Sequence, residues 1–157
     1  MNSNTHVENS AEASNELPLT NIGIIDIQHK KITELFQKLL ELKISKVDFE
    51  AVLIILDELD EHMNSHFATE ENLMRSAGVN DIEKHIQQHD FFRTKFREFR
   101  ERNEIKSDFL NNLNYELSIN FLKRWIFSHT NKFDLLYIES IKQYIDAGST
   151  KKEQGNQ

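Results

Sequence analysis

Apolar residues recur at alternating steps of three and four along four long stretches of this chain. The first stretch carries Ile25, Ile32, Phe36 and Leu39, and His29 occupies the position of the stripe between Ile25 and Ile32. This spacing puts the apolar side chains on one side of an α-helix and gives the helix a buried face. Only four Gly and one Pro occur in 157 residues, too few for the many tight turns of an all-β protein. We therefore predict an all-α protein.

The four stretches are long enough for four helices of about 20 residues joined by short connections, which is typical of an up-down-up-down four-helix bundle. The polar ends of the chain, residues 1–19 and 147–157, are predicted to be disordered tails around one domain at 20–146. The helices are expected at about 26–45, from Asp48 to Gly78, from Asn80 through Phe99 and from about 108 to His129, with a further helical segment near 135–145.

The composition narrows the possible functions. The net charge of −7 repels nucleic acid, and the longest apolar run, VLIIL at 52–56, is far too short to span a membrane. The N-terminus lacks the basic start and apolar core of a signal peptide, so we expect a cytoplasmic protein without membrane insertion. The absence of cysteine excludes disulfides, thiolate metal sites and cysteine nucleophiles.

Histidines lie on the apolar stripe of every predicted helix. A single histidine on such a face is more often a hydrogen-bonded core residue than a metal ligand. Five buried imidazoles between four helices, however, would need five separate partners. One bound metal cluster would satisfy all of them together. The histidines concerned are His29, His66, His85, His89 and His129.

Spacing along the helices supports chelation. Residues four apart differ by about 40° in direction and about 6 Å in height, so both can reach one ion. His85 and His89 have this relation, as do His66 and Glu70, whose carboxylate could bridge to a second metal. His62 lies four residues before His66, so spacing alone leaves a 62/66 pair open. We expect His62 to be a supporting or structural residue.

His129 and Asp134 are five residues apart and differ by about 140° on an ideal helix. Both can point inward only if the helix loosens between them, a feature often found at functional sites. We therefore predict a break in the helix there. Glu71 is turned by about 100° from Glu70 and is expected to face solvent.

Several enzyme motifs are absent from the sequence. It has no HExxH of a zinc protease, no Gly-rich phosphate loop and no GxSxG nucleophile elbow. The Glu-x-x-His pairs of ferritin-like di-iron enzymes are also missing. Imidazoles therefore dominate the predicted site.

Four segments together resemble the ligand motifs of bacterial hemerythrins (bacteriohemerythrins). GIIDIQHKK (23–31), HFATEENLM (66–74), HIQQH (85–89) and FLKRWIFSHTNKFDLLY (121–137) match that family in order. The resemblance covers about residues 20–140 and implies a hemerythrin-like bundle with a non-heme di-iron site.

The resemblance also implies a role for each predicted ligand. Three histidines would bind one iron and two would bind the other, with two carboxylates and an oxo or hydroxo group as bridges. Six coordination places are then filled on the first iron and five on the second. The implied ligands are His85, His89 and His129 for the first iron, His29 and His66 for the second, and Glu70 and Asp134 as bridges.

By the same resemblance, the vacant coordination place binds dioxygen reversibly, for oxygen storage, delivery or transport. Such a protein is not an enzyme, and dioxygen is its expected partner. One alternative is a di-iron redox enzyme or sensor that acts on peroxide, nitric oxide or iron. Another is a helical interaction module with purely structural histidines.

Residues near the predicted ligands raise further expectations. Phe67, Trp125 and Ile126 either wall an oxygen pocket or simply pack in the core. Thr130 stands where the family commonly has a branched apolar residue, so it could admit water and hasten autoxidation. Tyr137 matches a family tyrosine and is expected to hydrogen-bond near the site.

Asp26 has two open interpretations. It either orients His29 or starts the first helix. The segment before Gly23 also lacks the tryptophan that is customary in the family.

Overall fold

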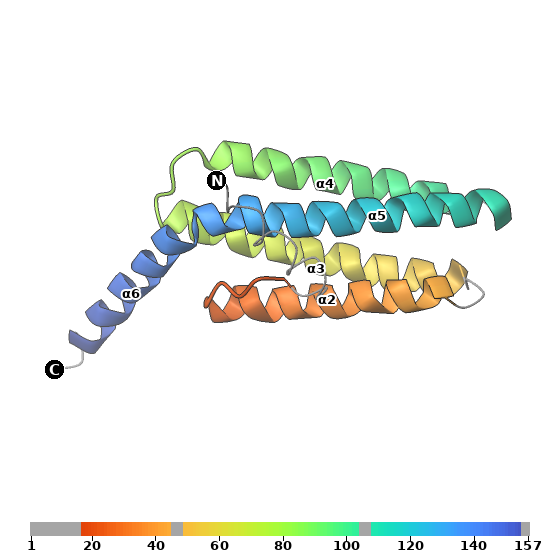
Figure 1. Cartoon of the computed structure of the whole chain (residues 1–157). Helices are drawn as coiled ribbons and strands as arrows, with labels where there is room; N and C mark the ends of the chain where they lie inside the picture. The colour runs from red at the N-terminus through yellow and green to blue at the C-terminus, as the bar shows by residue number, and fades with distance from the viewer. Residues whose placement is uncertain (1–16, 45–48, 104–107, 155–157) are drawn as a thin grey trace, which may run out of the picture.

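The protein is a bundle of four long helices that run alternately up and down (Figure 1). The structure is a computed structural model that describes residues 17–44, 49–103 and 108–154. Every regular element in these ranges is helical, which confirms the predicted all-α bundle. The predicted helix start at Asp48 lies outside the described residues. The four helices are α2 (Gly23–Ile44), α3 (Phe49–Ser76), α4 (Ile82–Asn103) and α5 (Asp108–Lys132).

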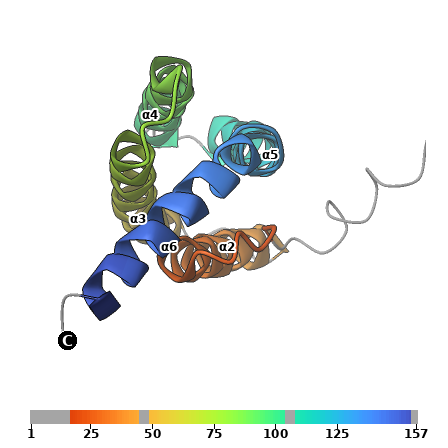
Figure 2. The same cartoon turned by 90° about the vertical axis from the view of Figure 1, so that its left-hand side faces the viewer.

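Two shorter elements follow the bundle. A 3₁₀-helix, η1 (Asp134–Leu136), leads into α6 (Ile138–Gln154), which contacts α3 and crosses the end of the bundle (Figure 2). Helix α6 continues past residue 146, where the sequence analysis placed the start of a tail, because the residues around 151–154 are good helix formers. The domain boundaries stay predictions. No helix in the described part of the chain is both long and apolar enough to cross a membrane.

The interior consists of a polar layer between two apolar clusters. The larger cluster fills most of the bundle, while the smaller one lies near α6 and contains Ile25, Met74 and Ile138. Along α2, His29 follows Ile25 of the smaller cluster and precedes Ile32 of the larger one. On α4 both buried histidines lie between Ile82, which packs against the smaller cluster, and Phe92 of the larger one, and on α3 Glu70 lies between Phe67 of the larger cluster and Met74 of the smaller. The polar layer is therefore shielded by apolar side chains on both sides.

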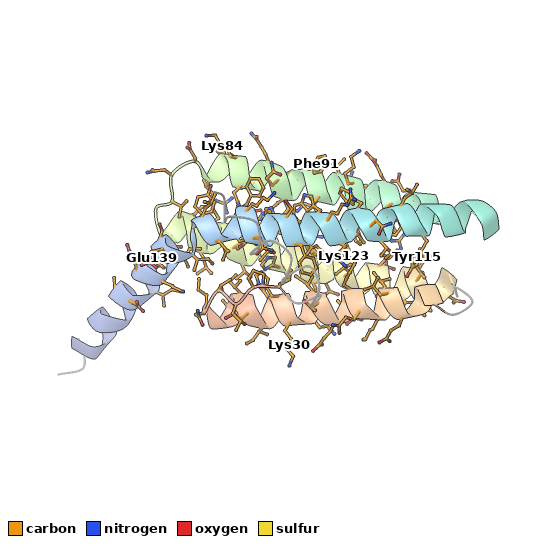
Figure 3. The ribbon with its side chains drawn as sticks, in the orientation of Figure 1. Lys30, Lys84, Phe91, Tyr115, Lys123 and Glu139 are labelled. Carbon is orange, nitrogen blue, oxygen red and sulfur yellow. The ribbon has the colours of Figure 1, made fainter. Side chains whose placement is uncertain are left out.

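At the end of the bundle away from α6, a buried hydrogen bond joins two helices, and on the outer surface charged side chains face solvent. The buried Tyr115 hydroxyl donates a hydrogen bond to the Leu39 carbonyl and so ties α5 to α2. Lys30 and Lys84 point away from the bundle into solvent (Figure 3). The helices thus present one apolar face inward and a charged face outward, as their periodicity predicts.

Helix α3 ends in a turn that needs a glycine. Gly78 has φ +67°, in the left-handed region, and its N–H donates to the Arg75 carbonyl at 3.1 Å. The Val79 N–H donates to the Met74 carbonyl at 3.0 Å, which completes a Schellman motif. This turn fixes the end of the helix that carries His66 and Glu70.

We expect Gly78→Ala to lower the free energy of unfolding by about 1 kcal/mol, because a Cβ disfavours the left-handed conformation. Gly23→Ala is the matched control, since Gly23 has no positive φ and an added Cβ there would meet no atom within 4 Å. Urea unfolding of both variants measures the difference. Equal stabilities of the two variants would contradict the assigned role of the turn.

Candidate metal centre

The seven side chains predicted as ligands lie together inside the bundle. Each is at most 3% exposed. They form two groups, and within each group one candidate ligand atom per residue lies within 4.8 Å of the others. The grouping separates three histidines from two, as the resemblance implies. The first group is Glu70, His85, His89 and His129, and the second is His29, His66 and Asp134.

Four long helices position most of these side chains. His66 and Glu70 lie one turn apart on α3, and His85 and His89 lie one turn apart on α4. Their backbone groups belong to regular helices, so the chelating pairs are held by rigid elements rather than by loops.

The predicted break between His129 and Asp134 is confirmed. Helix α5 ends at Lys132, and Phe133, with φ −108° and ψ −50°, leads into the 3₁₀-helix that begins at Asp134. The Phe133 N–H donates to the His129 carbonyl at 2.7 Å. The change of helix type turns Asp134 inward, so that its Oδ1 lies 3.0 Å from His129 Nε2.

The Glu70 carboxylate lies between the two groups. Its Oε2 is 3.4 Å from Nε2 of both His85 and His89 in the first group. The same oxygen is 3.7 Å from Nε2 of His66 in the second group. One carboxylate oxygen therefore faces histidines of both groups.

The Asp134 carboxylate, from the 3₁₀-helix after α5, also lies between the two groups. It belongs to the second group with His29 and His66, yet its Oδ1 is also 3.7 Å from His85 Nε2 and close to His129. Two buried carboxylates thus connect the two groups, which is the arrangement expected of bridging ligands.

Burial favours the uncharged form of four of the five imidazoles. It lowers the pKa of His66 to about 3, and it also lowers the pKa values of His29, His85 and His89. Neutral imidazoles retain a nitrogen lone pair, which is the form that binds metals.

The pKa values of the two buried carboxylates, Glu70 and Asp134, shift in opposite directions. Burial and the neighbouring charge of Asp134 raise the pKa of Glu70 well above its ordinary value. Burial also acts to raise the pKa of Asp134, but the contact with His129 and the other nearby histidines outweigh it and lower this pKa. Without a cation, the site therefore holds acidic groups that repel each other in a poorly solvated place.

Buried nitrogen and oxygen atoms without hydrogen-bond partners indicate whether these residues suit a metal ion. Among the residues that the structure describes, buried side-chain atoms without a hydrogen-bond partner include both ring nitrogens of His29, Nδ1 of His85 and of His129, and Oδ2 of Asp134. Buried polar atoms are nearly always paired in proteins, so this concentration calls for a further partner. Imidazole and carboxylate ligands together suit iron, zinc, copper and manganese. The donor set therefore fits metal ions.

One distance matches coordination closely. His89 Nε2 and His129 Nε2 lie 3.0 Å apart. Two nitrogen ligands at right angles, each about 2.1 Å from one ion, would lie about 3 Å apart. The two imidazoles are therefore spaced as neighbouring ligands of a single ion.

The prediction that Glu71 faces solvent is wrong. Glu71 is only 9% exposed, and its Oε1 lies 2.9 Å from Nδ1 of His89. A residue turned by about 100° from the central stripe of α3 faces the neighbouring helix α4 instead of water. The periodicity of α3 alone does not say which residues beside its central stripe a neighbouring helix covers.

Gln28 was missed by the sequence analysis for the same reason. Its Oε1 lies 3.4 Å from His66 Nδ1, and its Nε2 donates to Thr69 Oγ1 at 3.0 Å. Gln28 therefore supports the second group from α2.

Asp26, His62 and Tyr137 lie near the site but are not among the two ligand groups. Asp26 Oδ1 accepts hydrogen bonds from the N–H and hydroxyl of Thr20 at 2.7 and 2.8 Å, which favours the helix-start interpretation. His62 Nδ1 lies 2.8 Å from the Glu58 carbonyl on its own helix and joins neither group. The Tyr137 ring packs at right angles to the His85 ring, 5.4 Å away, and its hydroxyl contact stays a prediction.

Aromatic rings wall the site toward the larger apolar cluster. Phe67 stacks on His89 with ring centroids 3.9 Å apart, and Trp125 stacks on His129 at 4.4 Å. A cavity of about 10 Å³ lies beside His29, His66 and His129 and is also lined by Phe67 and Trp125. This volume is about the smallest that holds one water molecule.

Comparison with known proteins gives a consistent result. The family model described as "Hemerythrin HHE cation binding domain" matches residues 20–139. A bacteriohemerythrin of Pseudomonas aeruginosa is 30% identical over 136 residues, which cover 87% of this chain and 85% of the relative. A bacteriohemerythrin of Stenotrophomonas maltophilia is 32% identical over 137 residues, covering 86% of each chain. The crystal structure of a hemerythrin variant superposes with a TM-score of 0.66 at 26% identity, over 78% of this chain and 89% of that one.

The buried charge of Glu70 generates a stability prediction for the metal-free protein. Because burial raises the Glu70 pKa, ionising this group in the folded state costs free energy at pH 7. We expect Glu70→Gln to raise the free energy of unfolding of the metal-free protein by about 1–3 kcal/mol. The gain should disappear as the pH falls below 4.5, the ordinary pKa of this group, where wild-type Glu70 is protonated in both states.

Urea unfolding of metal-free proteins at pH 7 and pH 4 measures this gain. Glu61→Gln, at an exposed position of α3, is the matched control and should leave stability within about 0.5 kcal/mol of the wild type. A loss of stability in Glu70→Gln at pH 7 would show that the buried charge is well compensated without a metal.

Proposed function

The chain belongs to the hemerythrin family, and on that premise we propose that it binds two iron ions and carries dioxygen reversibly at one of them. The proposal covers oxygen storage, delivery or transport, and it assigns no enzymatic reaction to the site. Its main support is that two buried groups of ligand side chains share two carboxylates, beside a very small apolar cavity.

The ligand assignment follows the two groups. Three histidines of the first group would hold one ion, and two histidines of the second would hold the other. Glu70 and Asp134 would bridge the pair, with an oxo or hydroxo group as third bridge. The proposed ligands are His85, His89 and His129 for the first ion and His29 and His66 for the second.

When bound, the iron pair supplies the electrons for reversible dioxygen binding, one from each ion. The chain's own residues do the remaining work. Phe67, Trp125 and Ile126 exclude water from the cavity and slow the arrival of protons. A dry, apolar wall is what a reversible carrier needs, because water and protons promote irreversible oxidation.

Cavity size supports a small ligand. The enclosed space beside His29, His66 and His129 is about 10 Å³, so it admits a diatomic molecule only with small adjustments of its walls. The cavity touches both histidines of the second group as well as His129 of the first, and the resemblance implies that the vacant coordination place is on the ion of the second group.

Anaerobic reduction of the iron-loaded protein followed by exposure to air tests the function. We expect a visible absorption band that appears with oxygen and disappears when oxygen is removed, over repeated cycles. Irreversible oxidation in the first cycle would instead favour the alternative, a redox enzyme or sensor for peroxide, nitric oxide or iron. A protein that takes up no iron would contradict both.

Thr130 places a hydroxyl in the wall of this cavity and is only 3% exposed. We expect Thr130→Ile to slow autoxidation, because it removes a group that can hydrogen-bond to entering water. A loss of about 1 kcal/mol of stabilisation for that water corresponds to roughly fivefold in rate.

Thr130→Val is the matched variant, because it removes the hydroxyl while keeping nearly the same shape. Both variants should autoxidise more slowly in air than the wild type, as followed by absorbance. If Ile slows the reaction and Val does not, the added volume is responsible, and unchanged rates in both would rule out a role for Thr130.

A further inference from the structure

Glu71 is a buried acidic residue that is not among the proposed ligands. Its Oε1 lies 2.9 Å from Nδ1 of His89. The other ring nitrogen of His89, Nε2, faces Glu70 and His129 at 3.4 and 3.0 Å. Since an ionised carboxylate can only accept a hydrogen bond, the contact requires the proton on Nδ1 and leaves the lone pair on Nε2. That nitrogen is the one that points into the centre.

Arg93 holds Glu71 in place from α4. Its Nη2 lies 3.3 Å from Glu71 Oε1, and its Nε donates to Asn64 Oδ1 at 3.1 Å. The guanidinium carbon lies 5.0 Å from the centroid of the Phe67 ring. Asn64, Phe67 and Glu71 follow one another at helical spacing along α3, so a single arginine contacts the whole stripe. The side chain that orients His89 is therefore itself fixed.

A second arginine completes the surroundings of Glu71. Arg75 Nη2 lies 3.4 Å from Glu71 Oε2, so each carboxylate oxygen faces a guanidinium. The two guanidinium groups hold both oxygens of the Glu71 carboxylate and compensate its negative charge beside the centre.

The other histidines of the centre lack such a partner. His66 Nδ1 faces the neutral amide of Gln28 at 3.4 Å. In the described part of the chain, Nδ1 of His85, His129 and His29 has no hydrogen-bond partner. Within the described residues, His89 is the one histidine of the five whose Nδ1 contacts a charged side chain, while the Nε2 atoms of His66, His85 and His129 face Glu70 or Asp134.

We propose that Glu71, fixed by Arg93, is the positioning residue of the three-histidine group, and that it orients His89 and strengthens its Nε2 as a metal ligand. The inference rests on the proposed function for the identity of the metal. A carboxylate partner makes an imidazole a stronger donor, and removal of such a partner typically weakens metal binding about 10–100-fold. A stronger donor also favours the more oxidised metal and lowers its reduction potential.

Glu71→Gln tests the proposal because it removes the charge and keeps the shape. We expect about a 10–100-fold loss of Fe²⁺ affinity, measured anaerobically by competition with a chelator, and a higher reduction potential of the iron-loaded protein. Glu61→Gln, at an exposed position of the same helix, is the control and should match the wild type. Affinity within twofold of the wild type and an unchanged potential in Glu71→Gln would overturn the proposal.

A measurement on the metal-free wild type separates this inference from the proposed function. The ¹⁵N shifts of the His89 ring report which nitrogen carries the proton, and we expect Nδ1. A ring protonated on Nε2 alone would overturn the positioning role even if iron binds. If the protein takes up no iron, the proposed function fails, while the tautomer of His89 still decides whether Glu71 orients it. The same measurement serves if Glu71→Gln does not fold.

Discussion

The structure depends on the burial of two carboxylates among five imidazoles in the middle of an apolar bundle. Glu70 and Asp134 repel each other there, and several histidine nitrogens find no hydrogen-bond partner among the residues that the structure describes. Apolar clusters on both sides keep water away, so water can neither screen the two carboxylates nor pair with the histidine nitrogens. Cations bound between the two groups would solve both problems at once, by neutralising the acids and by pairing with the free nitrogen and oxygen atoms. The stability of the bundle and its proposed metal binding are therefore linked.

Regular helices bring almost all of the buried polar side chains together, with one departure from α-helical geometry. Four regular helices carry six of the seven proposed ligands, and only Asp134 needs a change of backbone, which the 3₁₀-helix supplies. The unequal division into three and two histidines then leaves one half of the centre less crowded, next to the small cavity. The partners of the histidine Nδ1 atoms also differ: His89 in the first group contacts the carboxylate of Glu71, whereas His66 in the second contacts the neutral amide of Gln28.

Most of the fold could be predicted from the sequence, because apolar periodicity and scarce Gly and Pro depend only on local spacing. The break before Asp134 was also predictable, since a five-residue step cannot place two side chains on one helical face. Glu71 could not be placed in this way. Its burial depends on which neighbouring helix covers it and on Arg93 from that helix, and single-helix periodicity contains neither fact.

The most direct test of the central claim is anomalous diffraction at the iron absorption edge from crystals of the iron-loaded protein. We expect two peaks per chain, both in contact with the carboxylates of Glu70 and Asp134. One should be surrounded by His85, His89 and His129, and the other by His29 and His66. A single peak, or peaks away from these side chains, would contradict the central claim.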